Sequence, residues 1–195
     1  MIHVCFGLHD KTGRYSKFTG TAMLSLFDNT SAEVTIHILH DDTLTTDIRD
    51  KFIYLAGRYG QTIKFYNVEE LCEAKLSEYL NLVPTVKNSR VTVGAFYRLF
   101  TPVIFPPDIE KIIYLDSDII VNLDLKELWQ LELGDKVFAA VPEISNGIDI
   151  KNCLTLCFEG YVKSENYFNS GVLFMNLKIL RGEEDNLRRG VKFRD

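Results

Sequence analysis

The stretch KIIYLDSDIIV, residues 111–121, places two carboxylates inside the most hydrophobic passage of the chain. An ionised carboxylate costs several kcal/mol to bury unless a partner offsets that cost. Asp116 and Asp118 therefore need a bound cation, a nearby basic side chain or an exit to water. The apolar residues before Asp116 have strand character, so the pair is predicted to lie where a buried strand ends.

Working outward from this stretch, short strand-like segments alternate with segments of helical period. The predicted strands are rich in β-branched or aromatic residues and cover residues 2–8, 34–40, 62–68, 111–116 and 137–141. The predicted helices repeat apolar residues at three and four and cover residues 16–29, 45–60, 69–80 and 93–105. This order predicts an α/β fold in which a mostly parallel, Rossmann-like sheet is flanked by helices.

The composition is that of an ordinary globular protein, with 195 residues, 46% apolar and 25% charged, so a single domain is expected. The net charge of -5 and the lack of a basic run argue against a nucleic-acid partner. The chain has neither a secretory signal nor an apolar run long enough for a transmembrane segment, so a cytoplasmic protein is expected. The four cysteines are scattered, which is typical of reduced, buried thiols: Cys5, Cys72, Cys153 and Cys157.

Ligands of parallel sheets gather beyond the carboxyl ends of the strands. His9 and Asp10 follow the first predicted strand, and the Asp-Ser-Asp motif follows a later one. Carboxylates suit Mg²⁺ or Mn²⁺, which commonly complete their shell with substrate phosphates, so the motif predicts a metal-diphosphate site, with a solvated turn as the alternative. The Gly-rich dinucleotide fingerprint and the phosphate loop are absent, which argues against a nicotinamide enzyme and a P-loop ATPase.

Three segments in order resemble glycosyltransferase family 8, whose members are retaining enzymes of the GT-A fold that use nucleotide sugars. They are the metal strand KIIYLDSDIIVNLDLKELWQLELGD, the preceding helix VTVGAFYRLFTPVIFP and the later strand YFNSGVLFMNLK. The resemblance covers essentially the whole chain. It implies that residues 1–195 form a single GT-A nucleotide-sugar-binding and catalytic domain.

The resemblance also implies roles for individual residues. Asp116 and Asp118 are expected to bind Mn²⁺ or Mg²⁺, with Asp116 also close to the ribose, and Ser117 is expected to contact the nucleotide. Arg98 is expected to fix the donor, either through phosphate oxygens or through a carboxylate that lines the site. Asn169 matches a position near the transferring sugar, where an amide can both donate and accept hydrogen bonds; a strand-entry turn is the alternative.

The first loop departs from the family pattern. Bacterial members often have two consecutive acids and an Asn there, whereas this chain has His9 and Asp10, then an apparent insertion at residues 11–13, then Arg14 and Tyr15. His9 and Asp10 are expected to contact uracil. Tyr15 is expected to lie flat against the base, an interaction worth about 1 to 3 kcal/mol in nucleic-acid systems.

The implied reaction is the transfer of galactose or glucose from a UDP-hexose to a hydroxyl of a carbohydrate or glycolipid acceptor, with retention at the anomeric carbon. A place in bacterial surface polysaccharide synthesis, with peripheral association at the inner face of the membrane, is the corresponding expectation. The family's later His-x-x-Gly-x-x-Lys-Pro-Trp motif does not occur, so the chain resembles the nucleotide-binding part of a longer protein. Two alternatives stay open: a haloacid-dehalogenase-like phosphatase, which also uses Asp-x-Asp after a strand, and an inactive nucleotide-sugar-binding module.

Overall fold

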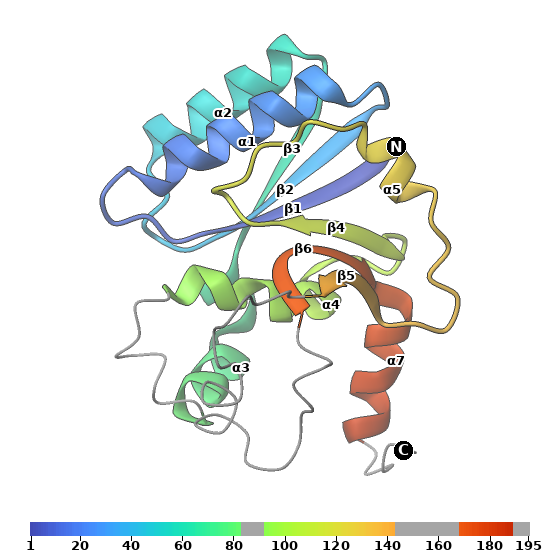
Figure 1. Ribbon diagram of the computed structural model, residues 1–195. Coiled ribbons are helices and arrows are strands. Elements are labelled where there is room, and N and C mark those ends of the chain that lie inside the picture. Colours follow the sequence, from blue (N-terminus) through green and yellow to red (C-terminus); the bar gives the residue numbers. More distant parts are fainter. Residues whose placement is uncertain (83–91, 143–167, 189–195) are drawn as a thin grey trace, which may run out of the picture.

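The computed structural model describes residues 1–82, 92–142 and 168–188 (Figure 1). The strands are β1 (Ile2–Leu8), β2 (Val34–His40), β3 (Thr62–Asn67), β4 (Lys111–Leu115), β5 (Phe138–Pro142) and β6 (Phe168–Asn176). The helices are α1 (Tyr15–Asn29), α2 (Thr46–Arg58), α3 (Val68–Leu82), the 3₁₀ helix η2 (Val93–Phe100), α4 (Thr101–Ile104), α5 (Leu125–Trp129) and α7 (Leu177–Arg188).

The strands form one sheet in the order β3-β2-β1-β4-β6-β5. The first four strands of this order are parallel, whereas β6 runs antiparallel to both β4 and β5. The predicted α/β fold with a mostly parallel sheet is confirmed. The chain proceeds from β1 outward to β3 and then returns to the other side of β1 as β4, so a topological switch point lies between β1 and β4.

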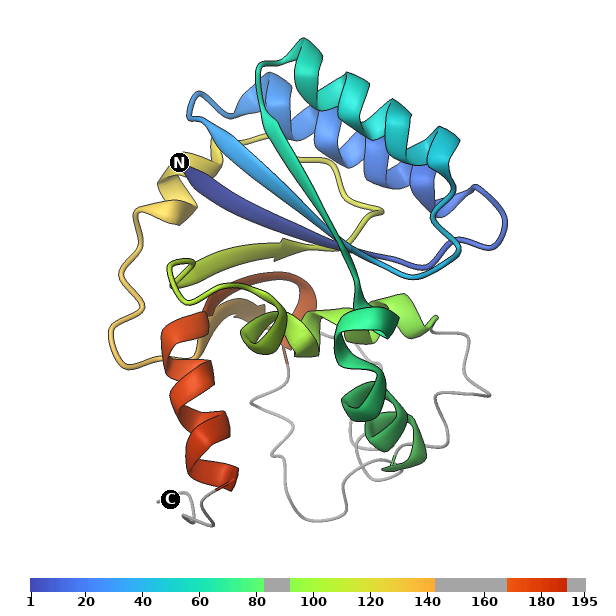
Figure 2. The same ribbon diagram turned by 180° about the vertical axis from the view of Figure 1, so that it is seen from behind.

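Helices cover both faces of the sheet (Figures 1 and 2). One face carries α1 and α2, and alternate β1 side chains such as Val4 and Phe6 enter a core with Met23 and Phe52 from these helices. The opposite face carries α3, η2, α4 and the start of α7, packed over residues that include Cys5. Because both faces are covered, every residue of β2 is buried, as expected for an interior parallel strand.

The single helix predicted over residues 93–105 is wrong in detail. The structure has a 3₁₀ helix up to Phe100, followed by the short helix α4. Pro102 has no backbone N–H and so cannot donate to the carbonyl of Arg98 four residues earlier. Thr101 satisfies that carbonyl instead, through its backbone N–H and through its hydroxyl at 2.9 Å.

Two glycines allow η2 to lie directly against the end of β1. A Cβ added to Gly7 would lie 2.5 Å from the backbone oxygen of Gly94, and a Cβ added to Gly94 would lie 2.8 Å from the backbone nitrogen of His9. Both distances are too short for a real side chain. This close approach brings Tyr97 and Arg98 of η2 to the carboxyl end of β1.

Arg181 makes several of the contacts that hold helix α7 against the turn before β4. The guanidinium of Arg181 donates to five backbone carbonyls between Pro102 and Ile109, at 3.0 to 3.4 Å. Proline-rich turns leave many carbonyls without N–H partners, and a planar five-donor group can serve several at once. Arg181 therefore links the strand-helix unit β6-α7 to the remainder of the sheet.

Two further sequence expectations concern thiols and membranes. Cys5 and Cys72 are buried thiols, as predicted, and burial raises the pKa of the Cys5 thiol. Cys153 and Cys157 lie outside the described residues. Across the described ranges, no helix has both the length and the apolar character needed to cross a membrane.

The side chains of His3, His37 and Tyr66 form a row of polar rings on the face of the sheet opposite α1 and α2. The fully buried His37 has its Nε2 3.0 Å from Nδ1 of His3 and its Nδ1 3.1 Å from the hydroxyl of Tyr66. Burial lowers the pKa of His37 to about 3, and the charges of His3 and Lys64 act in the same direction. His37 is therefore neutral in the folded protein near neutral pH.

This histidine should make the protein sensitive to acid. The unfolded chain binds a proton at His37 near pH 6.5, whereas the folded chain does so only near pH 3, so stability is complete above pH 6.5 and declines as the pH falls through this window. Between pH 7 and 5 the free energy of unfolding should fall by about 2 kcal/mol more in the parent than in His37→Gln. Urea titrations at both pH values measure the difference. An equal fall in the free energy of unfolding of the two proteins would contradict the lowered pKa of His37.

Candidate active site

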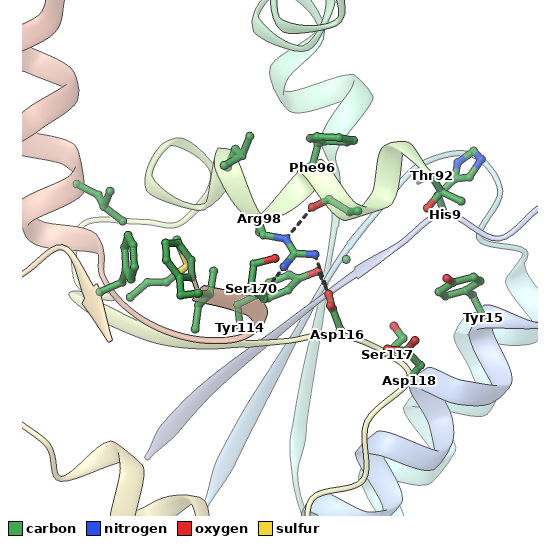
Figure 3. A pocket seen from close by; sticks show the side chains of 18 residues that line it. His9, Tyr15, Thr92, Phe96, Arg98, Tyr114, Asp116, Ser117, Asp118 and Ser170 are labelled. Atoms are coloured by element: carbon green, nitrogen blue, oxygen red, sulfur yellow. Dashed lines mark hydrogen bonds and ion pairs between the residues drawn. The ribbon is translucent and has the colours of Figure 1, made fainter. Parts of the chain in front are cut away.

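A cavity of about 680 Å³ lies at the carboxyl ends of β1 and β4, at the switch point (Figure 3). Its volume is in the range of small-molecule sites. Its walls come from β1 and the following loop, the start of α1, η2, β4 and its following turn, β5, β6 and the start of α7. One end carries His9, Tyr15 and the Asp-Ser-Asp motif, whereas the other is apolar, with Phe138 and Phe168.

Asp116, at the first position after β4, has a basic partner. Its Oδ1 accepts a hydrogen bond from Nη2 of Arg98 at 2.7 Å and another from the hydroxyl of Tyr114 at 3.1 Å. Its backbone N–H donates to the carbonyl of Gly171 on β6 at 2.7 Å. These contacts offset the cost of placing a carboxylate at the end of an apolar strand.

All three guanidinium nitrogens of Arg98 are used within the protein. Nε donates to the carbonyl of Ala95 at 2.7 Å, Nη1 donates to the carbonyl of Ser170, and Nη2 donates to Asp116. The guanidinium also lies over the ring of Tyr114, 4.2 Å from its centroid, and Arg98 is only 8% exposed. Of the two roles expected for Arg98, the structure places it on a carboxylate that lines the site.

The second oxygen of Asp116 faces β6 at a glycine. A Cβ added to Gly171 would lie 2.9 Å from Oδ2 of Asp116 and 3.0 Å from Oδ1 of Asn169, so a larger residue would crowd both groups. Oδ1 of Asn169 accepts a hydrogen bond from the backbone N–H of Gly171 at 2.8 Å. The structure thus brings the expected sugar-contacting residue close to the expected metal ligand.

Asp118 and Ser117 differ in their surroundings. Asp118 is exposed, lines the cavity and makes no hydrogen bond or ion pair with any described residue. Ser117 is buried, and its hydroxyl accepts a hydrogen bond from Oγ1 of Thr19 at 2.8 Å, which ties the turn after β4 to helix α1. The charges of the two carboxylates are therefore accommodated in different ways: Asp116 has a basic partner, and Asp118 is exposed to water.

This carboxylate pair fits a hard divalent cation. Each Asp keeps at least one oxygen clear of the protein contacts described above, and both side chains line the cavity. No group of three or more His, Cys, Asp or Glu that could hold a metal occurs among the residues described. Mg²⁺ and related cations commonly use one or two carboxylates and take the remaining ligands from water and substrate phosphates, so two suffice.

The segment after β1 contributes His9 and Tyr15 to the cavity. Asp10, in the same segment, holds the loop backbone in place by hydrogen bonds. Tyr15 begins α1 and is 41% exposed (Figure 3). The buried carboxylate of Asp10 accepts hydrogen bonds from the backbone N–H groups of Thr12, Arg14 and Ser16 at 2.7 to 3.2 Å. Burial alone would raise the pKa of Asp10, but the hydrogen bonds from the Ser16 hydroxyl and from the backbone N–H groups of Ser16 and Thr12 lower it.

Two groups at the site escaped the sequence analysis. Tyr114 could have been found, because residues two apart on a strand share a face and Tyr114 precedes Asp116 by two. Asp41, whose carboxylate contacts Nδ1 of His9, follows β2 and so lies at the same edge of the sheet as Asp116. The only sequence signal for Asp41 is that it is a polar residue directly after a predicted strand.

Solved glycosyltransferases share this architecture. The crystal structure of the galactosyltransferase LgtC with donor and acceptor sugar analogs superimposes with a TM-score of 0.66 at 22% identity, covering 99% of this chain and 67% of that one. The fold is therefore the GT-A fold. The model of glycosyl transferase family 8 matches residues 8–189, and the chain belongs to this family.

Curated relatives agree with this assignment. Lipopolysaccharide 1,2-glucosyltransferase of Escherichia coli is 31% identical over 153 residues, covering 78% of this chain and 41% of the relative. A putative glycosyltransferase of Haemophilus influenzae is 29% identical over 177 residues, covering 89% and 48%. The chain spans about half the length of these relatives. The family match favours the glycosyltransferase interpretation over the phosphatase alternative.

Proposed function

We propose that the chain binds a UDP-hexose with Mn²⁺ or Mg²⁺ and transfers galactose or glucose to an acceptor hydroxyl with retention at the anomeric carbon. The observation that carries this proposal is the pair Asp116 and Asp118 beside Tyr15 in one cavity at the switch point. The name of the Escherichia coli relative supports a carbohydrate or glycolipid acceptor and a role in bacterial surface polysaccharide synthesis. We further propose that the chain acts at the inner face of the membrane.

Each residue has a role that follows from its contacts. Asp116 and Asp118 would hold the cation, which supplies Lewis-acid stabilisation of the charge that builds on the departing diphosphate. Arg98 and Tyr114 fix Oδ1 of Asp116, which leaves Oδ2 directed toward Gly171. We infer that Arg98 is a positioning residue, because each of its three guanidinium nitrogens donates to a protein group and one of them holds Asp116.

The remaining residues bind the two ends of the donor. Tyr15 would stack on the uracil from the exposed start of α1, with His9 at the edge of the base. Asn169, beside Asp116, would exchange hydrogen bonds with hydroxyls of the transferring sugar. Asp10 and Ser117 support the nucleotide site indirectly, by shaping the first loop and by fixing the turn after β4 to α1.

Ligand-dependent melting tests the proposed donor class. UDP and UDP-hexoses with Mn²⁺ should stabilise the protein by about 2.7 kcal/mol at one hundred times the dissociation constant, which raises the melting temperature by about 5 to 10 °C. Nicotinamide dinucleotides should have no effect, because only ligands of the native state shift unfolding. Stabilisation by NAD without a response to UDP would overturn the proposal.

Two further measurements sharpen this test. Tyr15→Ala should reduce the shift caused by UDP and keep its metal dependence, whereas Tyr54→Ala, which removes an exposed tyrosine from α2, should match the parent. Release of UDP from a UDP-hexose would distinguish a transferase from an inactive binding module. Phosphate release from a phosphomonoester would identify a phosphatase instead.

A further inference from the structure

Behind His9 lies a buried hydrogen-bond network that the proposed reaction does not use. The carboxylate of Asp41, 3% exposed, contacts Nδ1 of His9 through Oδ2, which also accepts from the hydroxyl of Tyr97 at 2.7 Å. Its Oδ1 accepts from the backbone N–H of Thr43 at 3.0 Å and from the Thr43 hydroxyl. The network joins the loop after β1, the end of β2 and helix η2.

The side-chain oxygens of Asp41 accept hydrogen bonds from Thr43 and Tyr97 in addition to contacting His9. Burial raises the pKa of Asp41, but the hydrogen bonds from His9, Thr43 and Tyr97 outweigh burial and lower it, so the carboxylate is ionised. Burial and the Asp41 carboxylate raise the pKa of Tyr97, which keeps its hydroxyl protonated as a donor. An ionised carboxylate only accepts hydrogen bonds, so Nδ1 of His9 carries the hydrogen that it shares with Asp41.

This arrangement determines what His9 offers to a ligand. Its side chain is 16% exposed and lines the cavity at the same end as Tyr15. In the neutral ring, with the Nδ1 hydrogen directed at Asp41 as in a catalytic triad, the nitrogen left for a ligand is Nε2, and it presents a lone pair. A base stacked on Tyr15 would therefore meet a hydrogen-bond acceptor at His9.

We propose that Asp41 is a positioning residue that fixes His9 as a hydrogen-bond acceptor, so that the cavity selects a pyrimidine that carries a hydrogen on its ring nitrogen N3. The imide N3–H of uracil meets this requirement, whereas N3 of cytosine presents a lone pair and would face the lone pair of Nε2. This inference rests on the proposed function, because it assumes that a pyrimidine nucleotide occupies the cavity.

The contacts of Asp41 also determine the effect of replacing it by Asn. The backbone N–H of Thr43 can only donate, so the side-chain oxygen of the substituted amide must stay at the Oδ1 position. The amide nitrogen then occupies the Oδ2 position and donates to His9 and Tyr97. His9 must accept at Nδ1 and carry its hydrogen on Nε2, which is the tautomer reversal that such an Asp-to-Asn change causes in a catalytic triad.

Calorimetric titrations with UDP and CDP in the presence of Mn²⁺ test the inference. The parent should bind UDP at least about 10-fold more tightly than CDP, because the wrong base leaves buried polar groups unpaired. Asp41→Asn should lose this preference or reverse it. Asp42→Asn is the matched control: it removes the same charge from the next residue, which is exposed and bonded to Asn67, and it should keep the parent's ratio.

A measurement on the parent alone covers the case in which Asp41→Asn does not fold. N3-methyl-UDP lacks the imide hydrogen and should bind at least about 10-fold more weakly than UDP. Equal binding of N3-methyl-UDP and UDP, or an unchanged UDP-to-CDP ratio in a folded Asp41→Asn, would overturn the role of Asp41 alone. Failure of the parent to bind either nucleotide would overturn the proposed function and this inference together.

Discussion

Asp118→Asn is expected to abolish Mn²⁺-assisted binding of UDP while leaving the fold intact. Asp118 is exposed, and its replacement breaks no hydrogen bond or ion pair with the described residues. Removing one charge from a two-carboxylate site strongly weakens the binding of a divalent cation, because the remaining protein ligand would be Asp116 alone. The melting temperature without ligand should stay the same or rise slightly, since repulsion between two nearby carboxylates is relieved. Calorimetry with UDP and Mn²⁺ measures the loss.

Asp47→Asn provides the control for this substitution. Asp47 is an exposed carboxylate in the first turn of α2, where it pairs with Lys51 at 2.6 Å. Its removal changes the net charge equally and should leave UDP affinity at the parent value, because an exposed pair contributes little. Equal UDP affinity in Asp118→Asn and the parent would show that the metal assignment is mistaken.

Arg98→Leu should affect both stability and nucleotide binding. The substitution leaves the carboxylate of Asp116 and the carbonyl of Ser170 without their guanidinium donor. Breaking a buried ion pair costs about 3 to 5 kcal/mol, but the Asp116 side chain is 34% exposed, so a loss of about 2 to 3 kcal/mol is expected. UDP affinity with Mn²⁺ should fall about 10-fold or more, because an unfixed Asp116 is a poorer ligand.

The variant Arg98→Lys separates charge from shape. An ammonium keeps the positive charge but cannot reach Ala95, Ser170 and Asp116 together, so binding should still fall. Arg58→Leu, at the exposed end of α2, should behave as the parent in urea unfolding and in calorimetry. Parent-like affinity in Arg98→Lys would mean that charge alone matters at this position. Parent-like affinity in Arg98→Leu would contradict the positioning role.

The fold was largely predictable because its signals are local. The apolar residues at alternate positions of β1 and β2 and the continuous apolar run in β4 follow directly from which faces are covered, and these strands occur where the pattern predicts them. The antiparallel direction of β6 was not predictable, because a strand has the same apolar pattern in either direction. The break at Thr101 depends on one proline within an otherwise apolar periodic segment.

For the candidate site, the sequence identified residues that the cavity brings together, but it did not reveal most of their contacts. Asp116 and Asp118 stand out because carboxylates within an apolar strand need an explanation. Asp10 and Ser117 are residue types that could also bind a ligand. In the structure, however, the carboxylate of Asp10 accepts hydrogen bonds from the backbone of the first loop, and the hydroxyl of Ser117 accepts one from Thr19. Asp41 carries no local signal, since its role exists only once β1, β2 and η2 are placed together.

The central claim is that Asp116 and Asp118 together hold a divalent cation that binds the diphosphate of a UDP-sugar. Crystals of the chain grown with UDP and Mn²⁺ test it directly, because anomalous scattering locates manganese independently of the protein contacts. The account predicts one strong anomalous peak bound by both carboxylates and by diphosphate oxygens, with the uracil against Tyr15. UDP bound without manganese at these residues, or manganese bound elsewhere with both carboxylates vacant, would contradict it.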